Sequence, residues 1–214
     1  MTEVSIPHDD FSRDIIARGT SANRFADEEI AKRHGREYVA TGTDRIVIVD
    51  PTDPTRVLAL ERDPEQLSPK AAEELLNLHG IYATLFPHNF PEVYEAQGTT
   101  LGEEGVSGTS RQRIQKSRIP LPRRLAVRYP FLRVEAICSE VGIPLDIDRQ
   151  HSKNFMTGRD RGEYYVDTLY PLSRQQLEKL HAIAPGYMEQ QGFSAADREK
   201  VAKCLTNLNE ITSY

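Results

Sequence analysis

A short predicted hairpin in the second half of the chain constrains the fold most strongly. Residues 154–156 and 163–166 are candidate strands, and the segment 157–162 between them holds two glycines, which adopt turn conformations at little cost. Because Asn154 begins the first strand and Asp167 follows the second, we expect both side chains at the same end of the hairpin. An amide oxygen and a carboxylate that meet there suit Mg²⁺, whose remaining ligands are phosphate and water oxygens. The sequence therefore predicts a magnesium site formed by these two residues.

The composition narrows the class of protein. The chain has 214 residues, 38% of them hydrophobic, which is enough for one sizeable core or two small lobes. A net charge of −5 gives no general attraction to nucleic acid. Residues 1–7 lack the basic and apolar regions of a secretory signal peptide, and no stretch approaches the ~20 apolar residues that cross a bilayer. We expect a cytoplasmic protein with no membrane partner. Export by a signal other than a classical signal peptide stays open as the alternative.

The first half of the chain is predicted to be rich in β-structure. After a helical segment at 11–35, residues 38–50 have the pattern of a strand, a tight turn and a second strand, and residues 56–62 form a third strand. Three consecutive antiparallel strands make a meander. Ser68-Pro69 has the residue types preferred at a helix start, and the helix is expected to end at Gly80.

The second half is predicted to be mainly helical. Residues 92–96 are a short candidate strand, and helices are expected at 128–141 and after the capping boxes that begin at Ser173 and Ser194. The fold class is therefore α+β. The predicted parts are an N-terminal helical extension, a β-rich first lobe, and a hinge with a basic insertion and a helical second lobe, over residues 1–35, 36–96 and 97–214.

The order of these elements resembles the protein-kinase-like fold, which includes the aminoglycoside phosphotransferases. The layout agrees over about residues 36–171, and the specific part is the segment from Asn154 to Asp167. The resemblance implies a two-lobed fold with a small antiparallel β first lobe and a reduced helical second lobe. It also implies that Asn154 is the catalytic-loop asparagine and Asp167 the metal-binding aspartate, with ATP and Mg²⁺ as cofactors. Residues 92–96 would be the hinge that offers backbone groups to adenine.

The resemblance also implies a catalytic base in the loop before Asn154. Two alignments of the family pattern place the catalytic aspartate at Arg149 or at Ile147, and Asp148 lies between these positions. Asp148 would orient the acceptor hydroxyl and take its proton, and Asp146 is the alternative base.

Nucleotide-binding residues are implied in the first lobe as well. The turn that contains Gly42 and Thr43 would cover the phosphates. The strand that carries a lysine in kinases offers Arg62 here, since Arg62 continues the alternating face of the strand. Glu73 or Glu74, on the helix that follows, would pair with this arginine.

The resemblance implies a Mg-ATP-dependent phosphotransferase. The short chain after Pro171 favours a minimal atypical protein kinase, similar to those among bacterial effector proteins. The His-x-x-Asn spacing of His151 and Asn154 keeps small-molecule acceptors open. The absent lysine, and Thr168-Leu169 where the family has Phe-Gly, favour a second alternative, which is a pseudokinase or nucleotide-binding module without transfer activity.

A basic tract without acids suggests the kind of partner. Its members are Arg111, Arg113, Lys116, Arg118, Arg123, Arg124 and Arg128. Arginine clusters bind carboxylates and phosphorylated residues, and this tract has no interleaved aromatics to stack on bases. We therefore expect a protein acceptor with an acidic surface and not nucleic acid. A binding protein that docks acidic partners through residues 111–128 is the third alternative.

Overall fold

The chain forms two compact units in the computed structural model, which we describe separately. Unit 1 comprises Met1–Leu76 and Val93–Arg113, and unit 2 comprises Asn77–Glu92 and Ile114–Tyr214. The residues that the structure describes are 6, 9–19, 23–64, 67–100, 106–115, 129–147, 154–159, 163–167, 169 and 171–212. The expected boundaries at residues 35 and 96 do not coincide with these units, because the N-terminal helices and a strand beyond residue 97 both belong to unit 1.

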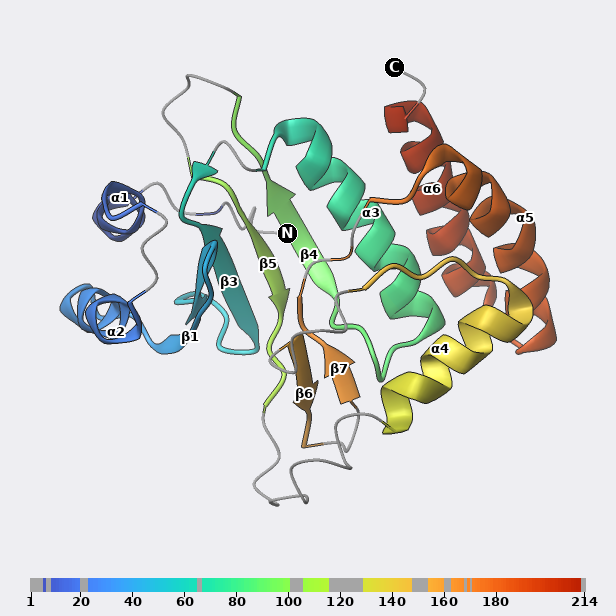
Figure 1. Ribbon diagram of the computed structural model, residues 1–214, viewed down its shortest axis with the longest axis horizontal. Helices are drawn as coiled ribbons and strands as arrows, with labels where there is room; N and C mark the ends of the chain where they lie inside the picture. The colour runs from blue at the N-terminus through green and yellow to red at the C-terminus, as the bar shows by residue number, and fades with distance from the viewer. Residues whose placement is uncertain are drawn as a thin grey trace. The chain divides into compact units, whose positions relative to one another are not determined.

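Unit 1 is built on a five-stranded antiparallel sheet (Figure 1). The strands in spatial order are β1 (Tyr38–Thr41), β2 (Arg45–Val49), β3 (Arg56–Glu61), β5 (Gly108–Gln112) and β4 (Val93–Gln97). The α+β class and the meander of the first three strands are confirmed. The short strand predicted at residues 92–96 is confirmed, since β4 pairs with β5 at the edge of the sheet, and the hinge role of these residues stays a prediction.

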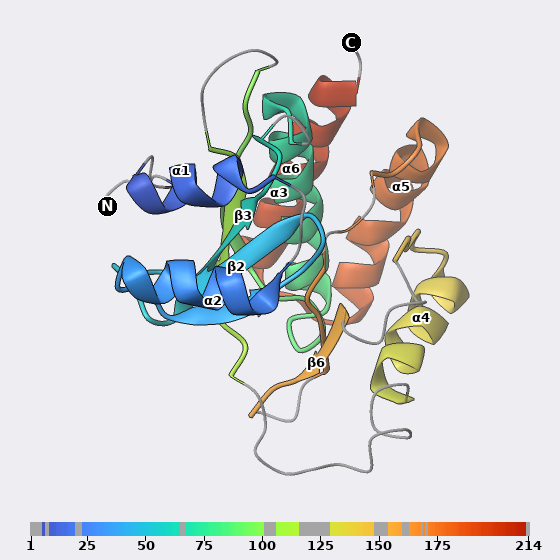
Figure 2. The ribbon, with the colours of Figure 1, turned by 60° about the vertical axis from the view of Figure 1, so that its left-hand side comes forward.

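Two N-terminal helices cover one face of this sheet. Helix α1 (Asp10–Ala17) begins at Asp9, whose side chain accepts a hydrogen bond from the Ser12 N–H, and helix α2 (Arg24–Arg33) begins at Asn23. The expected single helix over 11–35 is therefore two helices, because Gly19, with φ of +61°, ends the first. Figure 2 shows both helices beside β2.

The core of unit 1 lies between these helices and the sheet. Its members are Ile6, Phe11, Ile15, Ile30, Ala31, Ile46, Ile48, Leu58, Leu60 and Val106. Strand residues of this set alternate along β2 and β3, as expected for one buried sheet face. The opposite face carries a smaller cluster, in which Leu75 of α3 (Pro69–Leu85) and Leu67 pack against Val93 of β4.

Unit 2 is mainly helical. It contains the second part of α3, α4 (Tyr129–Val141), a two-stranded ribbon of β6 (Phe155–Thr157) and β7 (Glu163–Tyr165), α5 (Arg174–Gln190) and α6 (Ala195–Thr212). The capping box predicted at Ser173 is present with Gln176, and the Ser194 hydroxyl caps α6 by accepting from the Asp197 N–H. The predicted helices and ribbon of this half are confirmed.

The interior of unit 2 explains why α3 is longer than expected. Helix α3 continues through Gly80, where the sequence predicted its end, and stops at Leu85. A Cβ at Gly80 would lie 3.1 Å from the Cys204 Sγ of α6, so glycine at this position permits close helix packing.

Both cysteines, Cys138 and Cys204, are free thiols. Burial raises the pKa of the Cys138 thiol to about 12, which disfavours the reactive thiolate.

No helix in the described part of the chain is both long enough and apolar enough to cross a membrane.

Two glycine substitutions are predicted to have opposite effects on stability. The first tests the pairing of β3 with β5, and the second is a control in helix α5. A Cβ at Gly108 would lie 2.5 Å from the Ala59 carbonyl oxygen, whereas a Cβ at Gly186 in α5 would meet nothing within 4 Å among the described residues. Gly108→Ala should destabilise the protein by about 1–3 kcal/mol, and Gly186→Ala should stabilise it by up to about 1 kcal/mol. Urea unfolding followed by circular dichroism measures both. A Gly108→Ala variant as stable as the wild type would contradict the β3–β5 register.

Candidate functional site

The β6–β7 ribbon brings Asn154 and Asp167 to the same end, as expected. Phe155 pairs with Tyr165, and the Val166 N–H donates to the Asn154 carbonyl oxygen over 2.7 Å, which closes the ladder at that end. Asn154 therefore lies directly before β6 and Asp167 one residue beyond the last backbone bond of β7, and both are half-buried. The backbone thus places the two residues at one end of the ribbon, as the sequence predicted.

In the ranges that the structure describes, no group of three or more His, Cys, Asp and Glu side chains is placed to hold a metal ion. One amide and one carboxylate are side chains whose oxygens Mg²⁺ accepts as ligands.

The outer edge of β7 is held by the turn that follows α3. Asn89 donates from Nδ2 to the Glu163 carbonyl oxygen over 3.1 Å, and its own carbonyl oxygen accepts from the Tyr165 N–H over 2.8 Å. The Tyr165 ring contacts Phe90 and Phe155 edge-on. Strand β7 is thus held on both edges, which fixes the segment that leads to Asp167.

The start of the loop predicted to contain the base is also held by α3. The buried Tyr82 hydroxyl donates to the Pro144 carbonyl oxygen. Burial, with Cys138 and Asp146 nearby, raises the pKa of Tyr82 far above its ordinary value, so the phenol remains a donor. Asp146, the alternative base, is exposed. Asp148 and His151 lie outside the described residues.

Arg62 lies on the face of the sheet that α2 covers. It follows β3 and continues the alternation of Leu58 and Leu60, as expected, but its guanidinium is fully buried. Its Nη2 lies 2.5 Å from Asp27 Oδ2 and its Nη1 lies 3.3 Å from Asp27 Oδ1. The prediction that Arg62 pairs with Glu73 or Glu74 is therefore wrong. Helix α2 places the carboxylate of Asp27 over this face, and the guanidinium binds it there.

Asp27 accepts two further hydrogen bonds. Arg18 donates from Nη1 to Oδ1 over 3.1 Å, and the Thr41 hydroxyl donates to Oδ2 over 2.8 Å. The fully buried carboxylate of Asp27 thus joins α1, α2, β1 and the end of β3. A bidentate arginine and additional donors are the conditions under which a buried ion pair is tolerated.

Gly42 and Thr43 form the exposed tip of the β1–β2 hairpin. The Gly42 N–H donates to the Arg45 carbonyl oxygen over 2.9 Å, which closes the turn. A Cβ at Gly42 would meet Arg45 only at ordinary contact distance, 3.6 Å, so the turn itself does not require glycine. The Arg62 N–H donates to the Asp44 carbonyl oxygen, which joins this turn to the buried ion pair.

Glu74 lies half-buried on α3. Burial raises its pKa, and the positive charge of Lys70 partly offsets this effect. Lys70 is one turn earlier on the same helix, so the charge nearest to Glu74 is local.

The basic tract is not a single exposed surface. Arg111 is a buried residue of β5, 4% exposed, and its Nε donates to the Thr109 hydroxyl over 2.7 Å. Arg113 donates to Glu37 over 2.6 Å and to the Pro54 carbonyl oxygen. Arg111 is therefore not exposed to a partner, because it lies buried in β5, and Arg113 is half-buried and paired with Glu37. Lys116, Arg118, Arg123, Arg124 and Arg128 lie outside the described residues.

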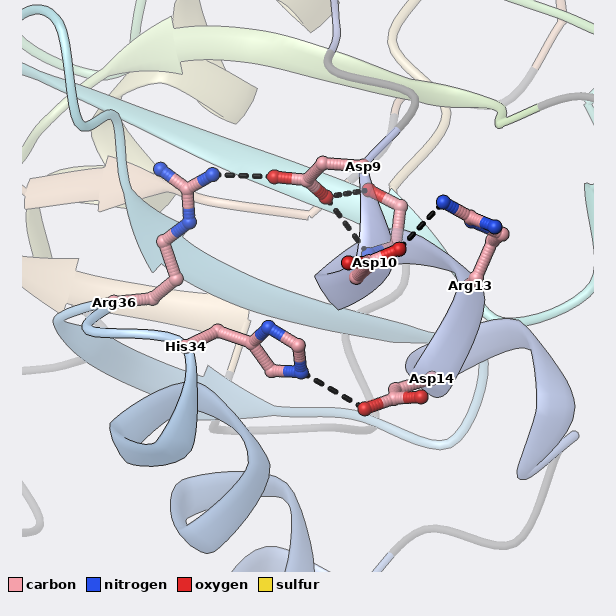
Figure 3. A network of polar contacts seen from close by, with 7 residues as sticks. Asp9, Asp10, Arg13, Asp14, His34 and Arg36 are labelled. Carbon is pink, nitrogen blue, oxygen red and sulfur yellow. Dashed lines mark hydrogen bonds and ion pairs between the residues drawn. The ribbon is translucent and has the colours of Figure 1, made fainter.

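A polar network at the N-terminal helices was not anticipated from the sequence. Figure 3 shows Arg36, two residues before β1, bonded to the Asp9 carboxylate, and His34 bonded to Asp14, a contact of 2.8 Å. His34 caps the C-terminus of α2 and Asp14 belongs to α1, so these bonds hold the two helices together. Their signal in the sequence is only the cap residue Asp9, because the other partners are distant along the chain.

Neither the comparison with known protein families nor the comparison with curated proteins finds a match for this chain.

The buried Asp27–Arg62 pair predicts a large effect of one conservative substitution. Asp27→Asn leaves the buried Arg62 charge uncompensated and should destabilise the protein by about 3–5 kcal/mol. Asp10→Asn is the matched control, because it removes the Asp10–Arg13 ion pair, whose side chains are 76% and 75% exposed. The control should change the free energy of unfolding by about 0–1 kcal/mol. Equal effects of the two substitutions, measured by urea unfolding, would contradict the buried network.

The Asp9 carboxylate predicts a specific dependence of stability on pH. Burial raises its pKa, but hydrogen bonds from Ser12 and Arg36 and the charge of Arg36 outweigh burial and hold the pKa below its ordinary 3.8. A lowered folded-state pKa stabilises the protein above the ordinary pKa, and this contribution is lost as pH falls through the folded value. Asp9→Asn should therefore be less stable than wild type at pH 7, and the difference should shrink below pH 3.8. A difference that stays constant from pH 7 to acid would exclude this role of the Asp9 charge.

Proposed function

We propose that this protein is a Mg-ATP-dependent phosphotransferase of the minimal atypical protein kinase type. The observation that carries the proposal is the closed end of the β6–β7 ribbon, where Asn154 and Asp167 lie on either side of the last backbone bond. The order of a β-meander, helix α3, two further strands, helix α4 and then this ribbon supports the same conclusion. It is the order implied by the resemblance to the protein-kinase-like fold.

The chemistry assigned to the chain is mainly positioning and electrostatic stabilisation. Asn154 and Asp167 would hold the magnesium that neutralises the phosphates of ATP. Asp148 would orient the acceptor hydroxyl and accept its proton while the γ-phosphoryl group moves from ATP to the acceptor oxygen and ADP leaves. Gly42 and Thr43, at the exposed hairpin tip, would cover the phosphates with backbone N–H groups.

Arg62 has no direct part in this proposal. Its guanidinium binds Asp27 on the helix-covered face of the sheet. We therefore assign Arg62 a structural role, in which its backbone N–H also holds the hairpin turn by donating to the Asp44 carbonyl oxygen. Glu74 likewise is not its partner.

One observation favours a second candidate function. The burial of Arg62 leaves the position that holds a lysine in kinases without a cation for the phosphates. A pseudokinase that binds nucleotide without transfer would have no need of that cation. Docking of an acidic protein remains part of the proposal only through residues 116–128, because Arg111 and Arg113 are occupied inside unit 1.

The proposed compartment is the cytoplasm. Both cysteines are unpaired, which agrees with a reducing environment.

The proposal predicts the loss of phosphate transfer when a metal ligand is removed. With radiolabelled ATP, Asp167→Asn should lower the rate by on the order of 10²-fold or more, because transition-state charge loses its counter-ion. Asp10→Asn is the matched control, because it removes an exposed carboxylate of unit 1, and it should keep the wild-type rate. Transfer that survives Asp167→Asn undiminished would refute the assignment.

A thermal-shift assay combined with an assay for labelled product separates the two candidate functions. A kinase and a pseudokinase should both be stabilised by nucleotide, since a ligand that binds only the folded state raises the melting temperature. Only the kinase should also form a labelled product.

A further inference from the structure

His79 on α3 makes a hydrogen bond that neither the sequence pattern nor the resemblance predicts. Its side chain is fully buried, and its Nε2 lies 3.2 Å from the backbone nitrogen of Leu169. Leu169 is 3% exposed and belongs to the core of unit 2. It lies two residues after Asp167.

The direction of this bond defines the state of the imidazole. A backbone N–H can only donate, so Nε2 accepts and carries no proton. His79 is therefore held as the neutral tautomer with its proton on Nδ1. The Leu169 N–H lies beyond the strand, where a ladder partner no longer satisfies backbone donors, and a buried donor without an acceptor is costly.

The position of the bond along the chain gives it functional meaning. The ribbon ladder ends at Val166, whose N–H donates to the Asn154 carbonyl oxygen. Three residues later, His79 fixes the backbone again at Leu169. Asp167 lies between these two fixed points, so both constrain the backbone that carries its carboxylate.

We infer that His79 is a positioning residue for the metal-binding carboxylate of Asp167. The inference rests on the proposed function, since it assigns His79 a role in the same metal site. Hydrogen-bonding partners outside the first ligand shell orient ligands, and their removal commonly lowers metal affinity by about 10–100-fold. His79 does so here through the backbone, by holding the residue two positions beyond the ligand.

Three substitutions distinguish the acceptor from the bulk of the side chain. His79→Gln places an amide oxygen at nearly the reach of Nε2, so it keeps an acceptor for the Leu169 N–H. His79→Asn has the same amide on a shorter side chain and does not reach. His79→Leu fills a similar volume without any acceptor.

The experiment is a titration of Mn²⁺ in the presence of ATP, followed by electron paramagnetic resonance, with Asp167→Asn as the reference for a lost ligand. We expect His79→Leu and His79→Asn to weaken Mn²⁺ binding by about 10-fold and His79→Gln to stay close to wild type. If His79→Leu does not fold, the Gln and Asn variants decide the question. Equal Mn²⁺ affinity in the Gln and Asn variants would overturn the inference, whatever their thermal stability.

A second readout does not depend on metal binding. Hydrogen–deuterium exchange of the Leu169 N–H should be slow in wild type and His79→Gln, and faster in His79→Asn. If wild type binds no Mn²⁺ with ATP while this exchange pattern holds, the proposed function fails and the anchor stands as a structural contact only. If exchange at Leu169 is the same in all variants, the anchor itself is refuted.

Discussion

The hydrogen bonds that α3 and its following turn make to the backbone of unit 2 determine how the candidate site is arranged. Tyr82 holds the Pro144 carbonyl oxygen at the start of one loop, and Asn89 holds the free edge of β7. His79 holds the backbone beyond Asp167. These acceptors and donors are buried or half-buried, so each lost bond would leave an unsatisfied polar group. Helix α3 and the turn after it thus fix the backbone of segments in unit 2 that lack regular hydrogen bonding of their own.

In unit 1 the corresponding constraint is the buried carboxylate of Asp27. Residues 1–35 were expected to be an extension, yet α2 supplies the partner of Arg62, and α1 supplies Arg18 to the same carboxylate. The helices also cover the apolar sheet face of Ile46, Ile48, Leu58 and Leu60. The N-terminal segment is consequently part of the folding unit.

Local patterns predicted the elements that local forces determine. The alternation of β2 and β3 identified two strands, and the cap residues Ser173 and Ser194 identified two helix starts. Strand β5 was missed because Gly108-Thr109-Ser110-Arg111-Gln112 has no apolar alternation, and its burial comes from β3 and β4 on either side.

Partners at long range could not be predicted in the same way. The alternation that placed Arg62 on a face was correct, but the sequence contains no signal that α2 would bring Asp27 over that face. The hydrogen bond from Leu169 to His79 joins residues ninety positions apart, and nothing local marks it. For the metal site, the sequence was sufficient to place Asn154 and Asp167 at one end of a ribbon, because a hairpin is local. The roles of these two residues in binding metal remain a prediction.

The most direct test of this account is nuclear magnetic resonance of the side-chain amide of Asn154 during addition of Mn²⁺ and ATP. The account predicts that this resonance broadens with substoichiometric Mn²⁺ only when ATP is present, while the amide of Asn209 on α6 stays sharp. It further predicts that Asp167→Asn abolishes the broadening. An Asn154 resonance that is unaffected by Mn²⁺ with ATP, or broadened equally in Asp167→Asn, would contradict the claim that the two residues share one ion.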